Sequence, residues 1–455
     1  MLQKPHCYLH LRLLFQIITT VPLLYGCKEF KKNNSCPLSH IDVVTKWADM
    51  TLFITKNTPA NTPTYSSRAL AYIGVTMYES VVNSAKEYNS LVKQLSGLDS
   101  LSKPDIGKKY NWLISLNASQ ALMIKSLYSH TAPENLEKVD SLEKSILLSL
   151  SASSNQETVE RSLNYGKQIA KEIYEWSVKD GGHKGYLQNF TLQFIPQHKP
   201  GNWKPSLYSQ VAGHLPLHPY WGNNRNFLQA DRDMAIPNKM PYDTNNHSAY
   251  FQGFQYVYDL NKNLSQSQKE VAMWWNDDPS ETFTPPGHSY NMGTIVIKKV
   301  QPSLIKCAET YAKIGLSVAD AFINCWRIKY HYSTERPSTF INNHIDPYWE
   351  SFWPDPPFPS FPSGHAFQAG ATAEVLTKMF GLNFKFSDSC HAGRQDDKVR
   401  KVKYKSRNYN SFWEAAEETA QSRLCGGIHT KEDNEIGLAL GKQLGVNVSK
   451  LKWTK

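Results

Sequence analysis

Apolar residues recur at three- and four-residue spacing along most of this 455-residue chain, and this period limits its fold more than any other feature. A helix with such a pattern buries one stripe of side chains against its neighbours. Few runs alternate with the period of a strand, so we expect an all-α fold. The spacing predicts helices over residues 41–54, 68–82, 112–127, 136–150, 158–178, 267–275, 297–335 and 365–380.

The segment 183–260 interrupts the helical pattern. It is rich in Pro, Asn, His and aromatic residues, as in PGNWKP at 200–205 and LHPYWG at 217–222. A loop of this length inside a compact domain is uncommon unless it is functional. We therefore expect ordered, irregular chain with short helices, packed over the helical core.

The composition excludes several classes of protein. A mean hydropathy of −0.49 argues against a protein that crosses the membrane many times. The net charge is +10, but we find no recognisable nucleic-acid module, so no nucleic-acid partner is expected. The seven cysteines give neither a disulfide framework nor a C-x-x-C pair of the kind that binds zinc. One disulfide is compatible with an oxidising compartment, and the spacing does not select its partners.

The first 27 residues read as an export signal. Basic residues and histidines precede an apolar stretch at 11–24, which is too short for a structural spanning helix. The following Leu-Tyr-Gly-Cys ends at Cys27 and resembles the bacterial lipobox, whose cysteine is lipidated. The alternative is a plain secretory signal. We expect an exported protein, either a periplasmic or cell-surface lipoprotein or a secreted one. Residues 28–40 would be a flexible tether, and membrane contact would occur only through the lipid.

Three segments in the last third of the chain contain unusual residues. The first contains Lys329 and Arg336, seven residues apart and followed by Pro337. On one helix these two cations would lie on the same face, and Pro337 would end that helix. Like charges repel unless an anion or an acid lies between them. The alternative is a solvated basic face.

The second segment is the run Pro362-Ser363-Gly364-His365 before a helix-forming stretch. A helix N-terminus offers free N–H groups and a partial positive charge, and glycine allows close approach of a ligand. The arrangement predicts an anion site. Without a ligand, Ser363 would be an N-cap and His365 a first-turn histidine.

The third segment holds Arg423, His429 and Asp433. A helix from Trp413 is predicted to end at 426–427. Thr430 and Asp433 have the spacing of a capping box for the next helix, and this is the plain structural interpretation of Asp433. Taken together, the three segments supply three cations, two histidines, a serine and two helix N-termini. Such a set suits a tetrahedral oxyanion, either phosphate or vanadate.

The motifs K-x6-R-P, P-S-G-H and S-R-x3-G-x-H-x3-D occur here in order. They resemble the signature of the superfamily that joins type-2 phosphatidic-acid phosphatases, bacterial acid phosphatases and vanadium-dependent haloperoxidases. Three surroundings resemble the haloperoxidases: WRIK at 326–329, PPFPSF at 356–361, and WNDD at 275–278 with TPPG at 284–287. The resemblance covers nearly everything after residue 40 and fits best the secreted bacterial branch, including vanadium iodoperoxidases.

The resemblance implies paired four-helix bundles with long irregular connections. The helical domain would span 41–455, with an N-terminal bundle over about 41–260 and an anion-binding bundle over about 261–455. The cofactor would be vanadate, with His429 as the ligand of vanadium. The residues that would hold vanadate are Lys329, Arg336, Ser363, Gly364, Arg423 and His429.

The resemblance also implies catalytic roles. His365 would be the acid–base group that assists exchange with peroxide, and Lys329 would polarise the peroxide. Asp433 would orient His429. Asp278 would support His365, although the alignment admits Asp277 equally well.

Trp326 and Phe358 would line the halide side of the site. The expected reaction is oxidation of halide by hydrogen peroxide to hypohalous acid, with iodide or bromide favoured over chloride. An organic acceptor and the oligomeric state are not specified by the sequence. The alternatives are a secreted acid phosphatase, in which His429 attacks phosphorus, and a non-catalytic helical surface protein.

Overall fold

The computed structural model describes residues 38–196, 199–206, 208–210 and 215–455. The predicted export signal, with Cys27, and nearly all of the predicted tether lie outside these residues. Leu38–Lys455 forms one compact unit. Within the described ranges, none of the helices has the length and apolar character needed to cross a membrane. The predicted division near residue 260 stays a prediction about domain organisation.

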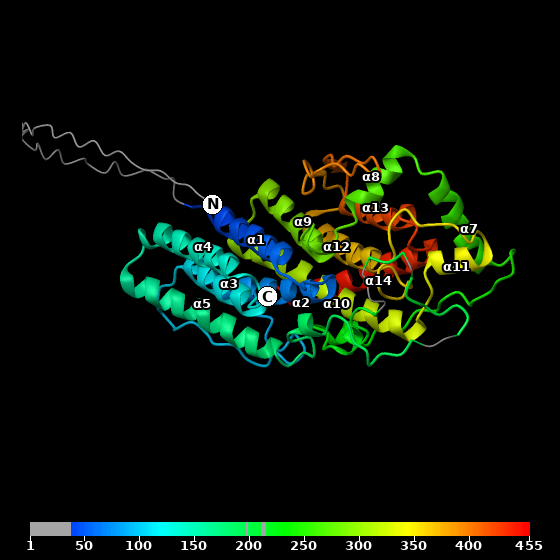
Figure 1. Cartoon of the computed structure of the whole chain (residues 1–455). Helices are drawn as coiled ribbons and strands as arrows, with labels where there is room; N and C mark the ends of the chain where they lie inside the picture. Colours follow the sequence, from blue (N-terminus) through cyan, green and yellow to red (C-terminus); the bar gives the residue numbers. More distant parts are fainter. Residues whose placement is uncertain (1–37, 197–198, 207, 211–214) are drawn as a thin grey trace, which may run out of the picture. The chain divides into compact units, whose positions relative to one another are not determined.

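The first bundle contains five helices at the N-terminal end of the described chain (Figure 1). They are α1 (His40–Asn57), α2 (Pro63–Val81), α3 (Trp112–Leu127), α4 (Pro133–Ser151) and α5 (Gln156–Ser177). Helix α3 packs against α2, α4 and α5, as the amphipathic spacing requires. Most of these helices begin at a Ser, Thr or Asn that caps the first turn, and the predicted ranges overlap all five.

The segment 183–260 is largely irregular, as predicted, but it also holds a regular helix that the sequence pattern missed. Its short elements are η2 (Gly185–Gln188), η3 (Trp221–Asn223) and α6 (Gln229–Arg232). A further 3-10 turn, η1 (Val82–Ser84), follows α2 in the first bundle. Helix α7 (Ala249–Lys262) is capped by Ser248. It buries Tyr250, Phe254 and Val257 and packs on α11 and α13. Aromatic residues and a glycine within α7 concealed its period.

The second bundle completes the all-α fold, which is confirmed. Its elements are α8 (Gln266–Trp274), α9 (Thr284–Val300), α10 (Leu304–Tyr332), α11 (Pro337–His344), α12 (Gly364–Phe380), α13 (Phe412–Cys425) and α14 (Lys431–Ser449). Between α12 and α13, β1 (Phe386–Asp388) and β2 (Arg407–Tyr409) form an antiparallel pair in which Phe386 lies opposite Tyr409. Helix α10 packs along α2 of the first bundle and against α12 and α14 of the second.

The predicted continuous helix over 297–335 is wrong. The chain breaks first at Gln301, whose φ of 53° is left-handed, and again at Ser333, with a φ of 49°. Pro337 then begins α11 instead of ending a helix, because a proline fits the first turn, where its missing N–H costs nothing. Lys329 and Arg336 therefore do not share one helical face.

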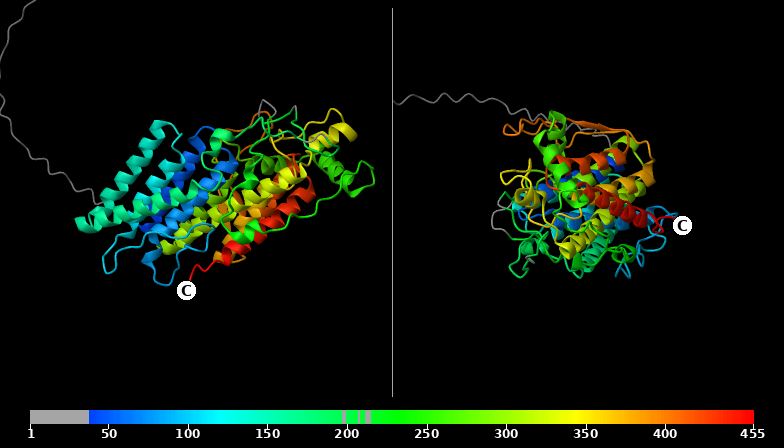
Figure 2. Two further views of the ribbon diagram at one scale, coloured as in Figure 1. Left: turned by 90° about the horizontal axis from the view of Figure 1, so that it is seen from below. Right: turned by 90° about the vertical axis from the view of Figure 1, so that its right-hand side faces the viewer.

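Helices α12 and α14 approach each other unusually closely, and glycines line the contact. A Cβ atom on Gly370 would lie 2.6 Å from the Leu438 carbonyl oxygen, and one on Gly437 would lie 2.8 Å from the Ser363 oxygen. The two helices, coloured orange-yellow and red, lie side by side in Figure 2. We call this contact the glycine seam.

The glycine seam predicts opposite effects for two helical Gly→Ala substitutions. Gly370→Ala should lower the free energy of unfolding by about 1–3 kcal/mol, because the added methyl overlaps backbone that cannot move independently. Gly253→Ala, in α7, meets nothing within 4 Å and should raise it by about 0.5–1 kcal/mol. Denaturant unfolding of both variants checks this, and equal effects would contradict the close packing.

Candidate active site

Three buried cations meet at one end of the second bundle. Lys329 lies in the last turn of α10, Arg336 is the N-cap of α11, and Arg423 lies in the last turn of α13. Each side chain is at most 1% exposed. The sequence therefore identified cations that do converge. Lys329 and Arg336 do so from the end of α10 and the start of α11, and not from one face of a single helix as predicted.

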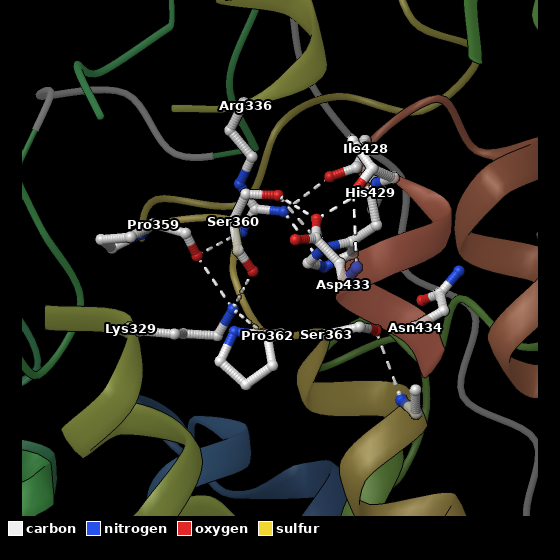
Figure 3. Close-up of polar contacts among 12 residues, drawn as sticks. Lys329, Arg336, Pro359, Ser360, Pro362, Ser363, Ile428, His429, Asp433 and Asn434 are labelled. Atoms are coloured by element: carbon white, nitrogen blue, oxygen red, sulfur yellow. Dashed lines mark hydrogen bonds and ion pairs between the residues drawn. The ribbon is translucent and has the colours of Figure 1, made fainter. Parts of the chain in front are cut away.

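The Lys329 ammonium is held by the loop that precedes α12 (Figure 3). It donates to the carbonyl oxygens of Pro359 at 2.9 Å, Ser360 at 2.6 Å and Pro362 at 2.6 Å. Three acceptors require all three N–H groups, so the charged form is the one that fits. Burial lowers the pKa of Lys329 to about 7. Its positive charge therefore acts on the site through space.

Arg336 is fixed by the same loop and by the segment before α14. Its guanidinium donates to the carbonyl oxygens of Phe358, Pro359 and Ile428. Nη1 also lies 3.2 Å from Nε2 of His429. Burial lowers the pKa of Arg336 to about 10, which still leaves it charged at neutral pH.

The two aromatic side chains predicted for the halide pocket are in contact. The ring centroids of Trp326 and Phe358 lie 4.9 Å apart. The Phe358 ring is 5.2 Å from Nζ of Lys329 and 5.0 Å from Cζ of Arg336, within the range of cation–π attraction. Phe358 is thus an apolar surface beside two of the cations.

His429 and Asp433 form the predicted pair. Nδ1 of His429 lies 2.9 Å from Oδ2 of Asp433. The same oxygen accepts the Ser360 hydroxyl at 2.5 Å and the Thr430 backbone N–H at 3.1 Å. Asp433 also completes a capping box with Thr430. Asp433 is therefore both a helix cap and the hydrogen-bond partner of His429, so the two interpretations are compatible.

These contacts select one form of the His429 ring. Burial and the nearby Arg336 lower the pKa of His429 to about 3, so the ring is neutral. Because Asp433 is a carboxylate that only accepts, the proton lies on Nδ1. Nε2 therefore presents its lone pair on the side of Arg336. A neutral imidazole held in this way is the usual form of a metal-ligating histidine.

The N-terminus of α12 faces the same site. Ser363 is the N-cap and accepts the Ala366 N–H, as the plain structural interpretation predicted. Its own N–H donates to the Asp433 carbonyl oxygen at 2.9 Å, which ties α12 to α14. Gly364 has ordinary helical geometry, and a Cβ there would meet Cys325 and Trp326 only at 3.7 Å. Its value to the site is therefore its free N–H in the first turn.

Two buried nitrogen atoms at the site have no partner among the described residues. They are Nε of Arg423 and Nε2 of His365. Burial and the nearby Arg423 hold the pKa of His365 well below its usual value, so this ring is neutral. Burial lowers the pKa of Arg423 to about 10. A buried donor without an acceptor is costly, and an oxyanion between these groups would supply one.

The support predicted for His365 differs from what is found. In the part of the chain that the structure describes, neither Asp277 nor Asp278 bonds to His365; the Asn276 backbone does. Asp277 binds His288 and His391. Asp278 accepts the Asn276 side-chain N–H at 2.7 Å, and burial raises its pKa to about 7.

One cavity lies next to the cations and not among them. Its volume is about 750 Å³, and it reaches the site at Ser360 and Asp433. Tyr250, Phe254 and Leu424 form its apolar wall.

Comparisons with known proteins agree with this geometry. The family model described as VCPO second helical-bundle domain matches residues 309–453. A relative, the vanadium chloroperoxidase of Curvularia inaequalis, is 21% identical over an alignment of 222 positions, and the match covers 36% of this chain and 36% of that protein. The described structure also superimposes on solved structures. The first is a bacterial vanadium-dependent iodoperoxidase, with 29% identity, a TM-score of 0.79, and coverage of 91% of this chain and 97% of that one.

The resemblance to the vanadium-dependent haloperoxidases is confirmed. A bacterial vanadium-dependent chloroperoxidase shares the fold at 16% identity, with a TM-score of 0.64 and coverage of 90% of this chain and 92% of that one. The stretch that matches this family model runs from within α10 to just beyond the end of α14. It contains all three cations, both histidines and Asp433.

Sequence reasoning missed two contributors to the haloperoxidase-like site. Ser360 donates to Asp433, and the Trp275 carbonyl oxygen accepts from Arg423 at 2.8 Å. Ser360 and Trp275 both lie inside stretches already recognised, PPFPSF at 356–361 and WNDD at 275–278, so their positions were usable signals. The contact through Trp275 depends on a backbone atom 148 residues away from its partner, and no side-chain pattern encodes it.

The double role of Asp433 can be separated by two substitutions. Asp433→Asn keeps the shape but loses the charge that fixes the His429 proton on Nδ1, so affinity for orthovanadate should fall about 10–100-fold. Thr430→Ala removes the cap acceptor and should cost about 1 kcal/mol of stability with little change in affinity. Isothermal titration with orthovanadate and thermal unfolding test both. Equal loss of affinity in the two variants would contradict the assignment.

Lys329 should make oxyanion binding depend on pH. Below its pKa of about 7 the side chain is charged and attracts an anion; above it the protein must take up a proton to bind. Affinity should therefore fall as pH rises through 7, by up to about tenfold per pH unit beyond the titration of the anion itself. Lys329→Met should lack this component, and the exposed Lys431→Met should keep it. Titrations at pH 6–9 that show identical slopes in all three proteins would refute the role of Lys329.

Proposed function

We propose that this chain is a vanadium-dependent haloperoxidase that oxidises halide with hydrogen peroxide to hypohalous acid. The observation that supports it best is the neutral His429, whose Nε2 lone pair faces Nη1 of Arg336 at 3.2 Å while Asp433 holds Nδ1. The balanced reaction consumes one proton, since halide, hydrogen peroxide and H⁺ give hypohalous acid and water. The fold neighbours, one of them at 29% identity, support the same class of chemistry.

The residues present fit vanadate. An anion would provide the acceptor that Nε of Arg423 lacks, and it would offset three cations whose pKa values burial has lowered. Nε2 of His429 is the nitrogen available to vanadium. When bound, vanadate supplies a Lewis acid that activates hydrogen peroxide toward halide.

The chain itself would supply position, charge and proton transfer. Arg423 and the N–H of Gly364 would hold the anion against the start of α12, while Lys329 and Arg336 supply positive charge. His365 is neutral, with Nε2 free to accept and return a proton. Burial of these groups excludes bulk water, which strengthens each interaction.

We further propose that iodide or bromide is preferred over chloride. The larger halides give up electrons more easily, so a site of modest oxidising power suffices for them. A solved structure that shares the fold with a TM-score of 0.79 and 29% identity is an iodoperoxidase. The Trp326 and Phe358 rings would form an apolar, polarisable surface for a large halide.

We also propose that the protein is exported and held at the cell surface or in the periplasm through Cys27. The support is the signal-like sequence at 1–27. Hydrogen peroxide and halide would then reach it outside the cytoplasm.

Halide oxidation by the protein without residues 1–27 is the direct test. We expect turnover of iodide and bromide with hydrogen peroxide only after addition of orthovanadate, while chloride is oxidised more slowly. p-Nitrophenyl phosphate hydrolysis is measured beside it. Phosphatase activity that vanadate inhibits, without halide turnover, would overturn the haloperoxidase proposal and favour the acid phosphatase.

His429→Ala should abolish both halide oxidation and orthovanadate binding, because it removes the imidazole whose Nε2 would bind vanadium. His247→Ala provides a matched control, since this histidine is exposed and far from the site in sequence. Retained vanadate-dependent turnover in His429→Ala would refute the assignment of the ligand.

A further inference from the structure

A second cluster of metal-binding side chains lies beside the candidate active site. His288 comes from α9, and Cys390 and His391 follow β1. One ligand atom of each lies within 4.8 Å of the other two. Nε2 of His288 is 3.3 Å from Sγ of Cys390 and 2.7 Å from Oδ2 of Asp388. These donors come from two segments about a hundred residues apart, so no short sequence motif could predict the cluster.

One carboxylate holds the outer edge of both histidine rings. Oδ2 of Asp277 lies 2.8 Å from Nδ1 of His288, and Oδ1 lies 2.7 Å from Nε2 of His391. A carboxylate bonded to the nitrogen that does not bind metal is the usual support of a zinc-ligating histidine. In this arrangement His288 directs Nε2 toward Cys390 and Asp388.

We propose that His288, Cys390 and His391 bind a divalent zinc ion, with Asp277 orienting the two histidines. Asp388, whose Oδ2 lies 2.7 Å from Nε2 of His288, would move in as the fourth ligand. Two imidazoles, a thiolate and a carboxylate make a four-coordinate donor set of the type that zinc prefers. Tetrahedral zinc with ordinary bond lengths places sulfur and nitrogen about 3.6 Å apart. The 3.3 Å between Cys390 and His288 needs only a small outward movement to reach it.

The charge of the buried cluster also suits this ion. Burial opposes ionisation of Asp277 and Asp388, but His288 outweighs it and lowers the pKa of both carboxyls, that of Asp388 to about 2. The two carboxylates in turn hold the pKa of His288 well above its usual value despite burial. Burial raises the pKa of the Cys390 thiol to about 12. A zinc ion would displace one proton from His288 and one from Cys390, so the net charge would not change.

The position of the cluster gives the ion a structural role next to the active site. His288 stacks on Trp275, with ring centroids 4.4 Å apart, and Asp277 lies two residues further along. The Trp275 carbonyl oxygen accepts from Arg423, and the Asn276 backbone bonds His365. Zinc would therefore fix the segment that positions two groups of the anion site. The proposal does not depend on the reaction that this site carries out.

Metal analysis of the full chain without its export signal, purified without chelators or metal affinity columns, tests the proposal. Zinc and vanadium are quantified separately, and about one zinc per chain is expected. Replacement by Co²⁺ should give the visible bands of tetrahedral cobalt and a near-ultraviolet thiolate band. Absence of stoichiometric zinc together with no thiolate–cobalt band in folded protein would overturn the proposal and leave His288 as an imidazolium between two carboxylates.

Variants locate the ion. Cys390→Ser and His391→Gln should lower zinc content and thermal stability, and Cys390→Ser should lose the thiolate–cobalt band. Cys425→Ser, at another free cysteine, should keep one zinc and the band. Cys390→Ser with unchanged zinc and an unchanged band would refute the assignment.

Discussion

The burial of three cations with few acidic partners is the constraint around which the second bundle is organised. Lys329, Arg336 and Arg423 are removed from water, and burial lowers the pKa of each. Backbone carbonyl oxygens from the loop before α12 replace much of the lost hydration. Hydrogen bonds from the buried cations thus tie this loop to the helix ends that carry them, next to the start of α12. An oxyanion bound there would neutralise the remaining positive charge.

How much the sequence could predict depends on the range of each interaction. Caps, amphipathic helices and the motif residues were predictable because neighbours in sequence determine them, as Thr430 and Asp433 show. The break at Ser333 was not, because a left-handed serine leaves no pattern in the sequence. Neither was the partner of His365, where a backbone contact replaced the expected carboxylate. The cluster around His288 joins segments that only the folded chain brings together.

The segment 275–278 shows how one stretch of chain can serve several groups at once. Its backbone bonds Arg423 and His365, its Asp277 holds two histidines, and its Asp278 is held by Asn276. A displacement of this segment would therefore alter the anion site and the histidine cluster together. Substitutions in it are expected to have coupled and non-additive effects.

The glycine seam determines how far apart the two sides of the site lie. Ser363 and Gly364 lie at the start of α12. His429 precedes α14, and Asp433 lies in its first turn, so the distance between the two pairs depends on the spacing of the two helices. Backbone contact at the glycines leaves this spacing no freedom to narrow. The width of the site, and hence the size of the oxyanion that it would bind, is thus determined by contacts along the length of two helices. Directed evolution of the width of the site would therefore act most strongly through residues of the glycine seam, such as Gly370 and Gly437, which lie between the helices.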